Sequence, residues 1–224
     1  MEKKLKITIS VMFALLFGAF IAMLKIVDVR PIGPAGTYVG LASLNGSAHE
    51  LIGKLTTLLV GSGELFDKIS DLALLAAFAV AGSFGLIGLI QFIRRKSLFR
   101  VDRTIIGLGI AYVLAGIVYI AFEMWVVNYR PVLEAGEVFP EASFPSSHTV
   151  LAFVIFATAV VAWGRLLENH AVVARLLQFC GVALLLVAVV SRVLAGVHWA
   201  TDIVGAIIIG LTITSIYSAI VTEA

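Results

Sequence analysis

Three short clusters of polar residues interrupt an otherwise apolar sequence, and all three lie in its second half. The last cluster consists of Ser191-Arg192, His198 and Asp202. His198 and Asp202 are four residues apart, so on a helix they would share a face. A carboxylate there can keep one imidazole nitrogen protonated and leave the other free to attack an electrophile. An isolated pair of this kind is usually a local surface contact, but the arginine before it favours an anion site.

The second cluster reads Pro145-Ser146-Ser147-His148-Thr149 and precedes an apolar run. Ser146 or Ser147 is a typical N-cap residue. The helix that it starts would offer free backbone N–H groups and a positive dipole end to an anion. His148 would lie in the first turn, where it could donate a proton to a leaving oxygen. Taken alone, this cluster would indicate only a capped helix with an interfacial histidine.

The first cluster runs from Glu123 to Arg130-Pro131. The planar guanidinium of Arg130 presents a fork of donors that suits phosphate oxygens and keeps its charge. Pro131 is expected to end the helix that precedes it. Seven residues are nearly two helical turns, so Glu123 should lie on the same face as Arg130 if the helix continues that far.

The elements that must hold these clusters are membrane-spanning helices. The chain of 224 residues is 61% hydrophobic and 13% charged, whereas a soluble domain has about 25% charged residues. Six apolar segments come near the roughly 20 residues that one span requires. The sequence therefore predicts an all-α, polytopic membrane protein built as a six-transmembrane-helix bundle. The predicted spans are Ile7–Leu24, Leu72–Phe92, Ile105–Phe122, Thr149–Trp163, Leu176–Ser191 and Ile203–Ile220.

The basic residues predict the orientation of this bundle. They gather before the first span, between the second and third, and between the fourth and fifth, which all lie on one side of a six-span chain. The positive-inside rule makes that side cytoplasmic and puts both termini there. The three polar clusters then meet at the outward ends of the last four spans. The residues that set this orientation are Lys3, Lys4, Lys6, Arg94, Arg95, Lys96, Arg100, Arg103, Arg165 and Arg175.

Three further features bear on the class of protein. The first span could instead be a cleaved signal peptide, but its length and the lack of a clear cleavage site favour a retained anchor. A helix lying at the membrane interface, or a structured loop, is expected around Leu51–Leu59. A net charge of only +2 does not suggest a nucleic-acid partner.

Together the clusters resemble the signature of the type 2 phosphatidic acid phosphatase superfamily. That signature is Lys-x6-Arg-Pro, then Pro-Ser-Gly-His, then Ser-Arg-x5-His-x3-Asp. Order, spacing and membrane placement agree over residues 123–202, and the six-span count agrees over the whole chain. Two positions differ: Ser147 stands where the family has glycine, and Glu123 stands where it has lysine. Serine is small and keeps the backbone amides, so little effect is expected from the first difference.

The resemblance implies a two-step mechanism at an outward-facing site. His198 attacks phosphorus, oriented by Asp202, and becomes a phosphohistidine. His148 protonates the departing lipid oxygen and then assists the water that releases phosphate. The phosphoryl oxygens are held by arginines and dipoles rather than by a metal, and neither a metal nor another cofactor is expected. The expected phosphate-binding groups are Arg130, Arg192, the side chain of Ser146, and the amides at Ser147.

The predicted protein is therefore a single membrane-embedded phosphatase domain over residues 1–224, in a bacterial-type plasma membrane. The substrates implied by the resemblance are undecaprenyl diphosphate, phosphatidylglycerophosphate and phosphatidic acid. Glu123 is expected to pair with an active-site arginine or to contact a polar head group, or else to have no role. Two alternatives remain, a phosphotransferase using the same histidine and a non-catalytic lipid-phosphate binder or transporter.

Overall fold

The computed structural model describes residues 2–133 and 136–222. Within these ranges, six helices are long and apolar enough to cross a membrane. Each contains one predicted apolar segment and extends beyond it at both ends, because polar residues of the flanks continue the helix. The predicted all-α bundle of six spans is confirmed. The spans are α1 (Glu2–Ile26), α3 (Glu64–Arg95), α4 (Arg103–Met124), α5 (Ser147–Leu166), α6 (Ala171–Ala195) and α7 (Ala200–Val221).

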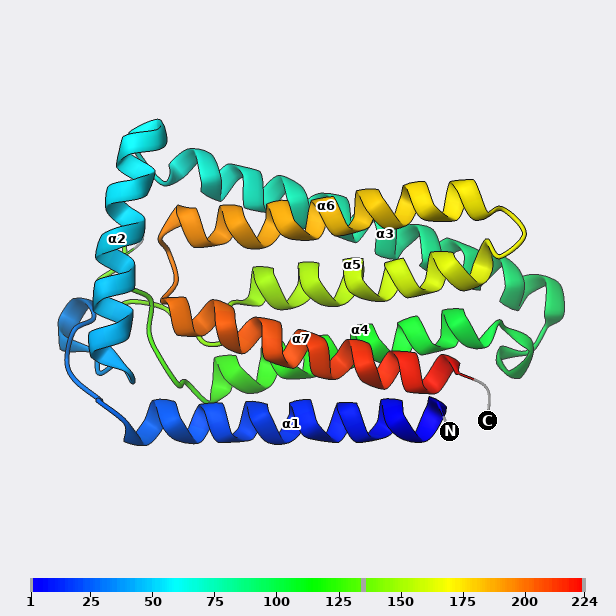
Figure 1. Cartoon of the computed structure of the whole chain (residues 1–224), viewed down its shortest axis with the longest axis horizontal. Coiled ribbons are helices and arrows are strands. Elements are labelled where there is room, and N and C mark those ends of the chain that lie inside the picture. Colours follow the sequence, from blue (N-terminus) through cyan, green and yellow to red (C-terminus); the bar gives the residue numbers. More distant parts are fainter. Residues whose placement is uncertain (1, 134–135, 223–224) are drawn as a thin grey trace.

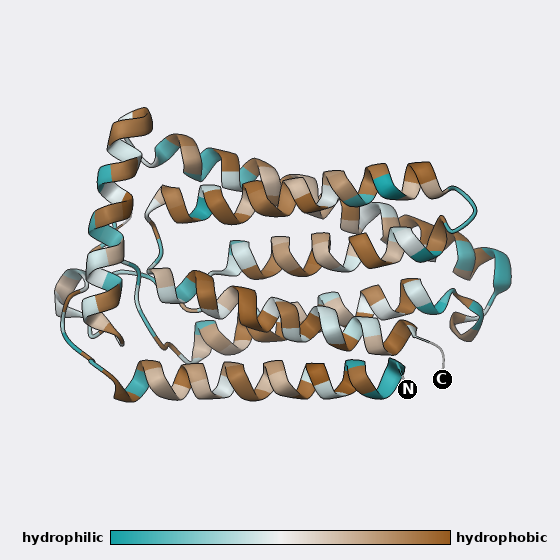
Figure 2. Ribbon diagram, viewed as in Figure 1, coloured by the Kyte–Doolittle hydropathy of each residue, from teal (hydrophilic) through white to brown (hydrophobic). Residues whose placement is uncertain are grey.

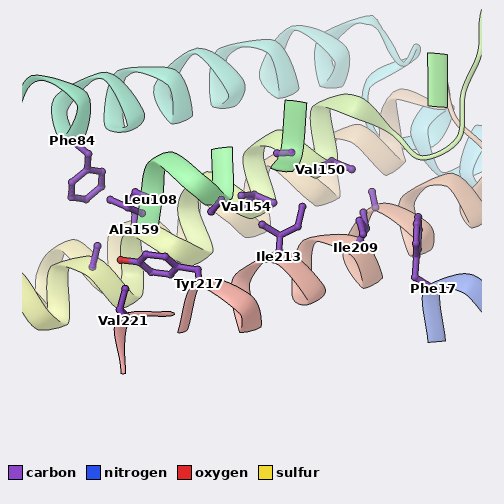
Figure 3. Close-up of a cluster of buried hydrophobic side chains, with 14 of the residues drawn as sticks. Phe17, Phe84, Leu108, Val150, Val154, Ala159, Ile209, Ile213, Tyr217 and Val221 are labelled. Atoms are coloured by element: carbon purple, nitrogen blue, oxygen red, sulfur yellow. The ribbon is translucent and has the colours of Figure 1, made fainter. Parts of the chain in front are cut away.

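Helices α5 and α7 form the centre of the bundle. About half of each apolar window is buried, 50% in α5 and 56% in α7, compared with 17–28% in the other four spans. Helix α5 packs against α3, α4, α6 and α7, while α7 also packs against α1 and α4. Their shared core contains Val154, Ile213 and Tyr217 (Figure 3). The two helices that begin next to the second and third polar clusters are therefore the most firmly enclosed.

The two ends of the bundle differ in character. Helix α1 begins and α7 ends at the same end (Figure 1), where Nζ of Lys6 donates a hydrogen bond of 2.8 Å to Oγ1 of Thr222. The predicted cytoplasmic loops, including the 3-10 helix η2 (Leu98–Arg100), also lie there. Hydrophobic residues dominate the lengths of the spans, and hydrophilic residues gather toward the ends (Figure 2). The three polar clusters all lie at the opposite end.

Helix α2 (Ala42–Val60) lies across that opposite end rather than along the bundle, as Figure 1 shows. It follows a loop that contains the 3-10 helix η1 (Pro34–Gly36). Oγ1 of Thr56 donates a hydrogen bond of 2.8 Å to the carbonyl oxygen of Leu194, near the end of α6. On its outer side Leu58 is 83% exposed. Of the two alternatives for residues Leu51–Leu59, the structure shows the helix and not the loop. Its apolar outer face is typical of a helix at a membrane surface.

The start of α3 approaches the end of α6 very closely. A Cβ atom at Gly63 would lie 2.3 Å from the carbonyl oxygen of Ala195, which real side chains do not tolerate. Glycine at this position therefore permits the backbone contact. It brings the first turns of α3 beside the last turn of α6, which carries Arg192.

Candidate active site

His198 lies in the short connection between α6 and α7. Helix α6 ends at Ala195, its C-cap Gly196 has a left-handed φ of 72°, and Trp199 is the N-cap of α7. The prediction that His198 and Asp202 share a helical face was wrong, because His198 precedes the helix. The pair forms nevertheless: Nδ1 of His198 is 3.7 Å from Oδ2 of Asp202. This is too long for a hydrogen bond, but it places a carboxylate beside the ring.

Asp202 is fully buried and held in place on several sides. Its Oδ2 accepts a hydrogen bond of 2.9 Å from the backbone N–H of Trp199, and its Oδ1 accepts one of 3.2 Å from Nδ2 of Asn128. Its carbonyl oxygen accepts a 3.2 Å bond from the N–H of Ser146. Hydrogen-bond donors of this kind offset the cost of burying a carboxyl group. These contacts join all three polar clusters at one residue, Asp202.

Arg192, in the last turn of α6, contacts the imidazole from the other side. Its Nη2 lies 3.2 Å from Nε2 of His198, and the arginine is only 3% exposed. Because a guanidinium can only donate, Nε2 must be the acceptor and carries no proton. In a neutral ring the proton is then on Nδ1, which faces Asp202. Burial lowers the pKa of His198, and the positive charge of Arg192 adds to this effect, so the neutral ring is favoured.

Two carboxylates of α3, which the sequence analysis does not single out, also belong to this cluster. Nη1 of Arg192 donates to Oδ1 of Asp67 and, over 3.4 Å, to Oγ of Ser70. Nε2 of His148 is 3.0 Å from Oδ1 of Asp71. A signal was present in the sequence, since ionisable residues beside a span often mark function. In the predicted topology, however, both aspartates fall at the end of the outward loop before the second span.

The second cluster begins α5 as predicted, but Ser147 and not the side chain of Ser146 lies at the pocket. Ser146 is the N-cap residue, yet its side chain makes no capping hydrogen bond. It is fully buried, and its Oγ accepts a 3.1 Å hydrogen bond from Oγ1 of Thr149. The predicted contact between the Ser146 side chain and phosphate is therefore not supported by this geometry. Ser147 lines the pocket instead, beside the start of α5.

The prediction that a helix ends at Arg130-Pro131 was wrong. Helix α4 ends at Met124, because Trp125 leaves the helical conformation with φ −116° and ψ 84°. The chain then bends at Val127 and pairs with the segment before α5, where the N–H of Arg130 donates a 2.9 Å hydrogen bond to the carbonyl oxygen of Glu141. The guanidinium of Arg130 lies 3.0 Å from the carboxylate of the same residue. Backbone pairing, not a helix, therefore positions Arg130.

A single pocket gathers members of all three clusters. Arg130, Ser147 and His198 line it, and Glu123 does as well although it does not share a helix with Arg130. The remaining walls are mostly apolar and come from α4, from α5 and from the segment that directly precedes α5. An imidazole, a guanidinium and a helix N-terminus at one pocket form an arrangement suited to phosphoryl transfer. The other lining residues are Val118, Tyr119, Phe122, Ala142, Ser143, Pro145, Val150 and Leu151.

The sequence matches the PAP2 superfamily over residues 104–224. The chain belongs to the PAP2 superfamily. The matched region contains the three clusters from Glu123 to Asp202, whereas α3 with its two aspartates precedes it. This PAP2 protein is similar in fold to the crystal structure of a transmembrane PAP2-type phosphatidylglycerolphosphate phosphatase from Bacillus subtilis. The TM-score is 0.61 at 20% sequence identity, and the match covers 94% of each chain.

No curated protein matches the sequence. The family match and the six apolar helices together establish a multi-pass membrane protein of the PAP2 superfamily.

Proposed function

We propose that this PAP2 protein is an integral membrane lipid phosphatase that works through a phosphohistidine at His198, without a metal. The observation that carries the proposal is the environment of this imidazole. Its Nε2 lone pair faces Arg192 at 3.2 Å, and its Nδ1 faces Asp202 at 3.7 Å. A phosphoryl group that takes the place of this contact with Arg192 would meet the lone pair of Nε2.

The reaction has two steps. In the first, Nε2 of His198 forms a bond to phosphorus in line with the lipid oxygen, that P–O bond breaks, and His148 gives the departing oxygen a proton. In the second, His148 takes a proton from water while the water oxygen attacks the phosphohistidine and releases inorganic phosphate. Asp202 stabilises the positive ring between the two steps. Arg130, Arg192 and the amides around Ser147 neutralise the phosphoryl oxygens.

The substrate class follows from the walls of the pocket. Apolar side chains of α4 and α5 lie beside the polar end that holds Arg130 and His198. This arrangement suits a lipid whose tail stays in the membrane while its phosphate reaches the histidine. Phosphate or diphosphate lipids of the undecaprenyl diphosphate, phosphatidylglycerophosphate or phosphatidic acid type are the candidates. Because the structural neighbour is a phosphatidylglycerolphosphate phosphatase, that lipid is the first to test.

The proposed domain is the whole chain, residues 1–224, in the plasma membrane. The basic loops between α3 and α4 and between α5 and α6 lie at the end of the bundle opposite to the start of α5 (Figure 1), where Ser147 lines the pocket. By the positive-inside rule, those loops and both termini are cytoplasmic, and the active site is extracytoplasmic.

The test measures phosphate release from a panel of these lipids by the full-length protein in detergent, with chelator and no added metal. We expect release by the wild type and none by His198→Ala. His170→Ala is the matched control, because His170 is an exposed histidine at the start of α6, at the other end of the bundle. Full activity of His198→Ala would refute the assigned nucleophile. Label recovered in a second lipid instead of in free phosphate would make the protein a phosphotransferase, and no release from any lipid would favour a binder.

A further inference from the structure

We infer that Asp71 positions His148, so that α3 supplies a second carboxylate–histidine pair to the site. The inference rests on the proposed function and deepens it by adding a positioning residue for the group that protonates the leaving oxygen. Asp71 is outside the region that matches the PAP2 superfamily and outside the three sequence clusters. It contributes through a contact between helices α3 and α5.

One face of α3 is turned toward the catalytic groups. Asp67, Ser70 and Asp71 are spaced three and four residues apart, so their side chains project from the same side of the helix. Asp67 and Ser70 accept hydrogen bonds from Arg192, whereas Asp71 contacts His148. Each carboxylate thus has its own cationic or ionisable partner. The pairings join residues that are 125 and 77 positions apart in the sequence.

The position of this face is fixed by the backbone and not only by the side chains. Gly63 sits against the carbonyl oxygen of Ala195, immediately before the first turn of α3. Ser70 is 2% exposed and Arg192 is 3% exposed, so the middle of the contact is closed to solvent. Asp71 therefore lies on a rigid element, and the 3.0 Å distance to His148 does not depend on a mobile loop.

The contact determines which nitrogen of His148 can exchange a proton. A carboxylate can only accept, so Nε2 of His148 carries a hydrogen that points at Oδ1 of Asp71. The other nitrogen, Nδ1, is then the one that gives its proton to the leaving oxygen. When that proton has left, the N–H···O bond to Asp71 holds the neutral ring ready to accept a proton from water. While His148 acts as the donor, the ring carries a hydrogen on each nitrogen, and after the transfer it is neutral.

Asp71 acts through His148 and not on the substrate. Its carboxylate contacts the imidazole of His148, and neither Asp71 nor His148 is among the residues that line the described pocket. Its side chain is 59% exposed, so solvent weakens its electrostatic effect. We therefore expect a smaller effect from removing Asp71 than from removing His148 itself.

The dependence on the leaving group tests this role. Nitrophenolate departs without a proton, whereas an alkoxide needs one. We compare kcat/KM for decyl phosphate and 4-nitrophenyl phosphate, because this constant reports the step that forms the phosphohistidine. Asp71→Asn should lower kcat/KM about tenfold for decyl phosphate and less than about threefold for 4-nitrophenyl phosphate. His148→Ala should show the same selectivity with a loss of about 100-fold or more for the alkyl substrate.

Two comparisons separate positioning from a structural effect. Glu64→Gln, on the same helix, removes an exposed carboxylate that pairs with Lys68. It should leave kcat/KM unchanged for both substrates. Asp71→Glu keeps the charge and should recover part of the activity toward decyl phosphate. Equal losses of Asp71→Asn on both substrates, or no loss on either, would overturn the inference alone. Wild-type protein that releases phosphate from neither substrate and from none of the lipids would refute the proposed function and this inference with it.

Discussion

Oδ1 of Asp202 accepts a hydrogen bond of 3.2 Å from Nδ2 of Asn128, and the two residues are 74 positions apart. Oδ1 of Asn128 faces the N–H of Gly40 at 3.5 Å, and the carbonyl oxygen of Gly40 accepts a bond from Nδ2 of Asn45. Nδ2 of Asn45 also donates a 2.9 Å bond to Oγ1 of Thr201, next to Asp202. The carboxylate beside the histidine is therefore tied to the segment that precedes α2. The position of His198, the proposed nucleophile, therefore also depends on residues outside the signature motifs.

Asn128→Ala should lower both the activity and the stability. The substitution removes a donor from the buried Oδ1 of Asp202, and leaving such a group unsatisfied costs about 1–3 kcal/mol. A carboxylate that is no longer held should position His198 less well, and we expect kcat to fall about tenfold. Phosphate release and thermal unfolding in detergent measure the two effects. Asn169→Ala, at an exposed position in the loop after α5, is the control. Unchanged kcat in Asn128→Ala would exclude a positioning role for the amide.

The spans could be predicted because each is a long apolar run, and such a run has few other uses in a protein. The third cluster could be predicted because Arg192, His198 and Asp202 lie within eleven residues of sequence. The first and second clusters are less specific, and they were assigned to the site because their order and spacing resemble those of the family signature. These parts of the site consist of residues that are close together in the sequence, so they can be recognised without knowing the three-dimensional structure.

The remainder of the site depends on packing between distant helices. Asp67 and Asp71 look like ordinary polar residues at the start of a span until α3 packs on α5 and α6. Asn128 is one amide in a loop until the chain folds back to Asp202. The end of α4 at Met124 was also missed, because the apolar residues Trp125, Val126 and Val127 continue beyond it. Composition alone does not distinguish an extended apolar segment from another helical turn.

The activity should fall at low pH as His198 becomes protonated. Burial, assisted by Arg192 and Arg130, lowers the pKa of His198 below its ordinary value of 6.5, while Asp202 opposes this shift. The neutral ring is the nucleophile, so the active form persists above the lowered pKa and disappears as the pH falls through it. The acidic limb of kcat/KM should therefore lie below pH 6.5. A limb above that value would contradict the assignment. The lipid phosphate itself ionises at about pH 6. Phosphorus NMR of the free lipid measures this ionisation, so that it can be distinguished from that of His198.

Arg192→Lys should lower the activity strongly although the positive charge is kept. Arg192 uses Nη1 for Asp67 and Ser70 and Nη2 for His198, so it needs a planar fork with donors in fixed directions. A lysine ammonium cannot reproduce that fork. We expect kcat/KM to fall about 100-fold, which is the size of effect seen when a positioned donor to a developing charge is removed. Arg175→Lys, at an exposed site near the start of α6, should retain full activity. Near-normal activity of Arg192→Lys would mean that only the charge matters.

Glu123 offers the sharpest test of substrate choice. It is exposed, and it lines the pocket together with Arg130 and His198, so an anionic group stands beside the proposed phosphate site. A carboxylate there repels phosphate but can accept a hydrogen bond from a hydroxyl group of the substrate. Phosphatidylglycerophosphate has a glycerol hydroxyl near its terminal phosphate, and phosphatidic acid has none. Glu123→Gln should therefore lower the ratio of kcat/KM for the first lipid over the second by about three- to tenfold, since a hydrogen bond to a charged group contributes about 1.5–3 kcal/mol when shielded and less when exposed.

Glu123→Lys should lower the same ratio further, because it also raises the activity toward phosphatidic acid by adding a cation, and this gain should shrink as salt increases. Glu168→Gln, an exposed carboxylate at the other end of the bundle, should leave both lipids unchanged. If neither substitution at Glu123 alters the ratio or the individual rates, the residue does not take part in catalysis or selection. The departure from the family's lysine would then have no functional consequence.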